Sequence, residues 1–140
     1  MRTFALTIPS RLEELDAVRG IVAQAAAEYH LSEDMAYWLE LTITESVINA
    51  IRHGNKCDPD KQASLKISSD GDSVEVIVED QGSGFSMDCL ADPRDAQNLL
   101  KPSGRGILII RSFMDEVVLS PRAEGGTRLR MVKKIDETPA

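Results

Sequence analysis

The spacing of hydrophobic and polar positions changes several times along the chain, and each change predicts a different element. Residues 3–8 alternate between apolar and polar side chains, which is typical of a short strand. A helical spacing follows to about residue 29, and Ser10 and Glu13 have the separation of a capping box, which predicts a helix start at Ser10. The apolar face of this helix is expected to contain Leu12, Leu15, Val18, Ile21, Val22, Ala25 and Ala26.

A second helix is predicted from Glu33 to about Arg52, a segment that contains neither Gly nor Pro. Ser32 is its expected N-cap, and Gly54 and Asn55 are expected to end it. At about 100° per residue, one broad arc is apolar and faces the core. That arc holds Leu39, Leu41, Ile43, Val47, Ile48, Ala50 and Ile51, and the opposite stripe holds Trp38, Thr42, Glu45, Asn49 and His53.

Two strand-like segments, 63–69 and 74–79, follow this helix. Asp70-Gly71-Asp72 separates them and has the composition of a hairpin turn, so we expect an antiparallel pair. Residues 80–104 are rich in Gly, Asp, Pro and Ser and show no sustained period. A loop of that length is unusual in a compact domain and is usually functional.

The last quarter of the chain predicts one more helix and a second hairpin. A short buried helix is expected over 107–114, followed by strands at about 116–120 and 126–134 with Gly125-Gly126 in the turn. The whole chain, 1–140, is therefore expected to form one α+β domain. Its architecture would be a two-layer sandwich of three helices and about five mostly antiparallel strands.

Composition narrows the class of protein. Apolar residues make up 42% of the chain without a run long enough to cross a bilayer, and no signal peptide is recognisable, so we expect a cytoplasmic location and no membrane contact. The net charge is −7 with scattered Lys and Arg, which argues against direct nucleic-acid binding. The two cysteines and two histidines do not have the spacing of zinc ligands; they are Cys57, Cys89, His30 and His53.

Three groups of residues have the chemistry of a site, and the first is Glu45 with Asn49. These residues stand one turn apart on a helix face, where a carboxylate and an amide can act side by side as general base and magnesium ligand. An ordinary solvated polar face has the same composition. Alone, the pair is a weak signal.

The second group begins with Asp80 and continues Gln81-Gly82-Ser83-Gly84-Phe85. A carboxylate at a strand end can accept a hydrogen bond from an amino group, and the glycines let the backbone approach a ligand closely. An ordinary Asp-Gly turn is the alternative. Met87 occupies the place of a third glycine, which argues against a Rossmann fingerprint, and no P-loop motif is present.

The third group is Gly104-Arg105-Gly106, directly before the predicted apolar helix. Free amides at a helix N-terminus favour phosphate, and Lys101 or Arg105 can add positive charge. A flexible hinge is the alternative interpretation.

In this order along the chain, the three groups resemble the GHKL ATPase superfamily. Glu45 to Ala50, followed by His53-Gly54-Asn55, resembles its N box, and residues 80–85 resemble its first glycine box. Residues 103–106 resemble its second glycine box. Gly126-Thr127 resembles the remaining element of its adenine pocket.

The compact length and residues 104–117 are most similar to the bacterial anti-sigma factors that are also serine protein kinases. This resemblance implies a Bergerat-type sandwich that binds Mg-ATP, with a mobile lid over residues 88–103. It also implies a sigma factor and an anti-sigma factor antagonist as protein partners, phosphorylation of a serine on that antagonist, and a homodimer.

The resemblance also implies roles for individual residues. Glu45 would be the catalytic base, and Asn49 would hold the magnesium ion. Asp80 would bind the adenine amino group with help from Thr127. Further contacts to the nucleotide would come from Gly82, Gly84, Gly104, Arg105 and Gly106.

Two other functions remain open from the sequence. One is a non-catalytic binding module in which ATP changes the affinity for a partner. The other is the catalytic domain of a histidine kinase, although the chain lacks the helical hairpin that would carry an acceptor histidine.

Overall fold

The computed structural model describes residues 2–55, 58, 60–82, 110 and 112–135. Five strands and two α-helices form this part of the chain, together with a 3-10 turn, η1, and a π-helical turn, η2. In chain order the elements are β1 (Phe4–Pro9), η1 (Leu12–Glu14), α1 (Leu15–Glu28), α2 (Glu33–Asn49), η2 (Ala50–Gly54), β2 (Gln62–Ser69), β3 (Ser73–Glu79), β4 (Glu116–Pro121) and β5 (Thr127–Lys134).

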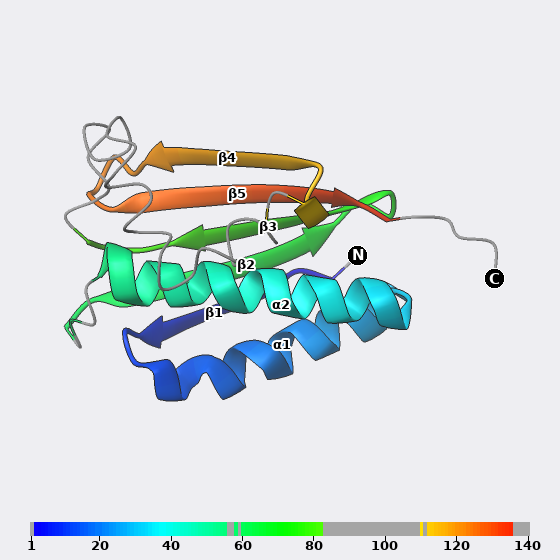
Figure 1. The fold of residues 1–140 in the computed structure, drawn as a ribbon, viewed down its shortest axis with the longest axis horizontal. Helices are drawn as coiled ribbons and strands as arrows, with labels where there is room; N and C mark the ends of the chain where they lie inside the picture. Colours follow the sequence, from blue (N-terminus) through cyan, green and yellow to red (C-terminus); the bar gives the residue numbers. More distant parts are fainter. Residues whose placement is uncertain (1, 56–57, 59, 83–109, 111, 136–140) are drawn as a thin grey trace.

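The strands form one antiparallel sheet in the order β1-β2-β3-β5-β4. Both α-helices lie on the same face of this sheet, with α2 across its middle and α1 beside β1 (Figure 1). The expected two-layer α+β sandwich is confirmed, and its five strands are all antiparallel.

The core lies between the helices and the sheet. Leu39, Ile43 and Val47 of α2 are at most 1% exposed, because their spacing of four residues keeps them on one side of the helix. Every second side chain of a strand points toward the helices and packs against these residues, because side chains alternate between the two faces of a sheet. The inward residues of the two central strands β2 and β3 are Ala63, Leu65, Ile67, Val74, Val76 and Val78, all buried.

The expected helix start at Ser10 is wrong. The Ser10 side chain caps no helix: its hydroxyl donates to the Lys61 carbonyl oxygen at 2.8 Å and accepts from Asn55 Nδ2 at 2.7 Å. The chain then makes the turn η1 before α1 begins at Leu15. The Ser10 hydroxyl thus forms its hydrogen bonds with residues about fifty positions further along the chain. A local motif cannot reveal such distant partners.

The expectation of three helices is also corrected, because the described residues contain two α-helices. The third was expected over 107–114, and most of that segment lies outside the described residues. Ile110, Ser112 and Phe113 are described there and are helical. No helix in the described ranges has the length and apolarity needed to span a bilayer.

The predictions for α2 are largely confirmed. The Ser32 hydroxyl accepts a hydrogen bond from the Met35 amide at 3.1 Å, so Ser32 is the N-cap. The α-helix ends at Asn49 rather than near Arg52, and η2 continues it as a wider turn. Thr42 is fully buried, so it is not part of the exposed polar stripe.

Both hairpins are found where the sequence places them. Gly71 has φ of 98° in the turn between β2 and β3. Gly125 and Gly126 have φ of 98° and 101° between β4 and β5. These backbone conformations strongly favour glycine, which is why the turn residues were readable from the sequence.

Candidate functional site

The candidate site is centred on Asp80, directly after β3. Asp80 is 4% exposed, and its Oδ1 accepts hydrogen bonds from the backbone amides of Gly82 and Thr127, each at 3.1 Å. Its own amide donates to the Thr127 carbonyl oxygen at 3.0 Å. The structure thus brings together three of the predicted nucleotide-binding residues, because the pairing of β3 with β5 places their ends side by side.

Three glycines pack against Asp80 or against each other at this point. A Cβ atom on Gly54 would overlap the Asp80 carboxylate, and one on Gly126 would overlap the Asp80 carbonyl oxygen. A Cβ atom on Gly82 would overlap the Gly54 carbonyl oxygen. Glycine is therefore required here for close approach of backbone, and the three positions form a cradle around the carboxylate.

Burial raises the pKa of Asp80 above its ordinary value. Loss of solvation is the largest cause, and the two amide hydrogen bonds and the charge of Arg122 oppose it. Both amides bond to the same carboxylate oxygen, Oδ1, and the other oxygen, Oδ2, packs against Gly54, where a Cβ atom would overlap it. A buried carboxylate at the end of a strand is suited to accept a hydrogen bond from a ligand amino group.

Arg122, in the turn after β4, supports the backbone of Asp80. Its guanidinium donates to the Asp80 carbonyl oxygen at 2.9 Å and pairs with Glu79 at 3.5 Å and Glu124 at 2.9 Å. Sequence reasoning missed Arg122, because a lone arginine in a hairpin turn carries no motif. Its contact with Asp80 depends on the order of the strands.

Asn55 is a second residue whose role the sequence did not show. It is 1% exposed, and its side-chain Oδ1 accepts from the Gln81 amide at 2.8 Å. Its Nδ2 donates to Ser10 Oγ at 2.7 Å and to the Gln62 carbonyl oxygen at 2.9 Å. The motif His53-Gly54-Asn55 was the available signal, and its physical meaning is that Asn55 joins three segments beneath the site.

Glu45 and Asn49 occupy the outer stripe of α2 as predicted, and both are half-buried. The helix leads through η2 to Gly54, whose backbone lies against the Asp80 carboxylate. The end of the segment that begins with Glu45 and Asn49 therefore lies against Asp80, where β3 ends. His53, on η2, has its pKa lowered by burial and by the charge of Arg52.

Several predicted site residues lie outside the described residues. These are Gly84, Lys101, Gly104, Arg105 and Gly106, together with the expected lid over 88–103. Their roles stay predictions.

The residues present fit a purine nucleotide. The glycine cradle brings backbone close to Asp80, and a carboxylate can accept a hydrogen bond from an exocyclic amino group. A group of three or more carboxylate, histidine or cysteine ligands is not found in the described ranges. The predicted magnesium ligand, Asn49, lies at the end of α2, and its role stays a prediction.

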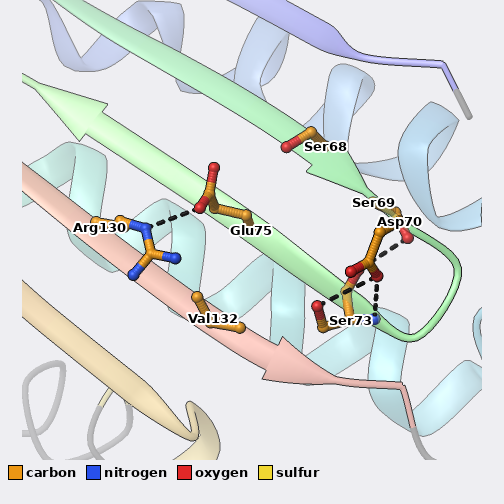
Figure 2. A pocket seen from close by; sticks show the side chains of 7 residues that line it. All are labelled: Ser68, Ser69, Asp70, Ser73, Glu75, Arg130 and Val132. Atoms are coloured by element: carbon orange, nitrogen blue, oxygen red, sulfur yellow. Dashed lines mark hydrogen bonds and ion pairs between the residues drawn. The ribbon is translucent and has the colours of Figure 1, made fainter.

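A separate hollow lies on the face of the sheet that the helices leave open (Figure 2). Its charged groups already have partners: Arg130 bonds to Glu75 at 2.7 Å and to Glu116 at 3.0 Å. The Asp70 carboxylate accepts from the amides of Asp72 and Ser73, each at 2.9 Å. We assign no site to this hollow.

The fold and the cradle around Asp80 define a nucleotide-binding α+β domain, and comparison with known families agrees. The family model described as "Histidine kinase-like ATPase domain" matches residues 8–133. The chain belongs to this family, whose domain binds ATP.

Individual relatives cover almost the whole chain. The chain is 33% identical to an anti-sigma F factor of Heyndrickxia coagulans over 135 residues, which cover 92% of this chain and 88% of the relative. It is 29% identical to the anti-sigma F factor of Geobacillus kaustophilus over 139 residues, 96% and 94% of the two chains. A serine-protein kinase RsbW of Staphylococcus epidermidis is 27% identical over 141 residues, 93% and 85%.

Proposed function

We propose that this chain is an ATP-dependent anti-sigma regulatory factor that binds a sigma factor and phosphorylates a serine on an anti-sigma factor antagonist. The names of its relatives, anti-sigma F factor and serine-protein kinase RsbW, support both parts of this proposal. The observation that carries it is Glu45, a carboxylate on the outer stripe of α2 beside Asn49. ATP binding alone does not require a general base at that position.

In this proposal, the described residues have separate roles in binding ATP and magnesium. The Asp80 carboxylate would accept a hydrogen bond from the adenine amino group, while the amides of Gly82 and Thr127 hold the carboxylate in place. Asn49 offers an amide oxygen to the magnesium ion that would accompany the phosphates. ATP supplies the phosphoryl group, and the transfer depends mainly on positioning and charge stabilisation.

Glu45 would accept the proton of the serine hydroxyl as the serine oxygen forms a bond to the γ-phosphorus of ATP, and the bond from that phosphorus to ADP would break, so that ADP leaves. A general base of this kind contributes roughly 10²- to 10⁴-fold to a rate. The proposal also includes a homodimer located in the cytoplasm, which sedimentation and fractionation would test.

The decisive experiment incubates the purified chain with γ-labelled Mg-ATP and, one at a time, each purified anti-sigma factor antagonist of the source organism. We expect label on one serine of an antagonist. Glu45→Gln should lower the rate by about 10²-fold or more while ATP still raises the melting temperature. ATP binding without serine phosphate on any antagonist would contradict the kinase and favour a non-catalytic, ATP-gated switch.

A further inference from the structure

Two large aromatic side chains are exposed on α2. Tyr37 is 59% and Trp38 43% exposed, and their rings form an edge-to-face pair with centroids 5.4 Å apart. Trp38 is the one tryptophan of the chain. The core does not use either ring, because Leu39, Ile43 and Val47 already fill the buried side of the helix. An exposed aromatic pair of this kind is typical of a protein contact.

The pair lies on the approach to Glu45. Trp38 precedes Glu45 by seven residues, which is nearly two turns, so the two side chains point within about 20° of each other and lie about 10 Å apart along the axis. Asn49 follows on the same stripe. Trp38 therefore continues the surface that contains the candidate base, and Tyr37, eight residues before Glu45, points about 80° to one side of it.

The usual area of a protein interface indicates that one partner would contact both Trp38 and Glu45. A standard interface covers about 800 Å² on each partner, equivalent to a disc of about 16 Å radius. A folded protein that presents a serine hydroxyl to Glu45 therefore covers Trp38, about 10 Å away, unless the contact is entirely one-sided.

Charge indicates the chemistry of that protein. Asp34 lies one turn before Trp38, and Glu40 lies one turn after Tyr37, so acidic groups flank the rings. Arg19 of α1 approaches Glu40 at 3.9 Å, but it bonds to Asp16 at 2.9 Å. A complementary partner has an apolar centre bordered by Lys or Arg.

We propose that Tyr37 and Trp38 form the docking surface for the serine-bearing antagonist, which contacts them through an apolar patch with a basic border. This inference rests on the proposed kinase function. The rings bind the substrate protein and take no part in the phosphoryl transfer.

The test measures steady-state phosphorylation of the antagonist that the wild type phosphorylates. Trp38→Ala and Tyr37→Ala should each raise KM about 10-fold or more, leave kcat within about 2-fold, and keep the melting-temperature rise with Mg-ATP. Val118→Ala is the matched control, because Val118 is 44% exposed and lies on β4, away from α2. It should change neither constant.

A second readout uses salt. Raising the ionic strength should raise the wild-type KM, and Asp34→Asn should weaken that dependence, because screening acts on the acidic border. An unchanged KM for Trp38→Ala in an active kinase would overturn the docking surface alone. A wild type that phosphorylates no antagonist would overturn the proposed function and this inference with it. Loss of self-association in Trp38→Ala, with KM unchanged, would assign the surface to a second copy of the chain and overturn the inference.

Discussion

At the scale of one residue, the buried carboxylate of Asp80 lowers the stability of the folded state. Its carboxylate is buried and its pKa is raised, which means that the folded state disfavours the charged form. Gly54, Gly82 and Gly126 have no side chain, which allows the backbone to pack closely around Asp80. Such an arrangement weakens the fold and is suited to binding, so Asp80 is where stability and function should separate.

Asp80→Asn should make the ligand-free protein more stable near neutral pH, by about 0.5–2 kcal/mol. The asparagine keeps Oδ1 as the acceptor for Gly82 and Thr127 but carries no charge. Because the wild-type pKa is raised on folding, wild-type stability falls as the pH rises from the ordinary value of 3.8 through the raised value. The stability difference should therefore open over that window, as urea unfolding at several pH values would show. A variant less stable than wild type at neutral pH would contradict this account.

Gly54→Ala should destabilise the fold by about 3 kcal/mol or more, because its new Cβ would overlap the Asp80 carboxylate. Gly20 on α1 supplies the matched control. No atom stands within 4 Å of a Cβ at Gly20, so Gly20→Ala should stabilise the helix by about 0.5–1 kcal/mol. Chemical denaturation of both variants measures the two signs. Equal effects would show that the glycine cradle is unimportant.

At the scale of elements, the end of α2 is held by connections between segments that are distant in sequence. Asn55 follows η2 and bonds to residues next to β1, in β2 and after β3. These bonds fix where α2 ends relative to the strand that carries Asp80. The helix stripe with Glu45 and Asn49 and the cradle around Asp80 are thereby held in one frame.

Asn55→Ala should cost about 2–4 kcal/mol, because the buried Asn55 side chain makes three hydrogen bonds that are lost at once. Gln81→Ala is the control: its side chain accepts one exposed bond from the Gln62 amide, so its loss should cost less than about 1 kcal/mol. Thermal unfolding of both variants separates these values. A mild effect of Asn55→Ala would mean that water replaces its bonds.

At the scale of the whole molecule, the helices cover one face of the sheet and leave the other open (Figure 1). The open face is held by ion pairs across the strands, such as Glu75–Arg130–Glu116, and these exposed pairs contribute little stability each. The site lies instead on the helical side, at the end of the sheet where β3 ends and β5 begins. A ligand bound there would contact both the helical layer and the sheet.

Mg-ATP should therefore stabilise the whole fold. At about 100 times its dissociation constant, a ligand adds about 2.7 kcal/mol, or several degrees in Tm. Thermal unfolding with and without Mg-ATP should show this shift in the wild type and its loss in Asp80→Asn. No shift in the wild type at millimolar nucleotide would mean that the fold does not bind Mg-ATP, and equal shifts in both proteins would remove Asp80 from the nucleotide site.

The sequence by itself determined what depends on neighbouring residues. The period of α2 and its cap Ser32 were readable, as were both hairpin turns, because helical facing and positive φ are local properties. The order of the motifs also predicted Asp80 and Thr127 as site residues. Their roles came from a pattern, not from any contact that the sequence could show.

Tertiary structure alone decided the contacts between distant segments. Ser10 has the local pattern of a cap, yet it bonds to Asn55 and Lys61 because β1 and β2 pair side by side. Arg122 reaches Asp80 because β5 lies between β3 and β4. Local chemistry selects the elements, but a polar group bonds to whatever the sheet order brings within reach, and that order is a property of the whole chain.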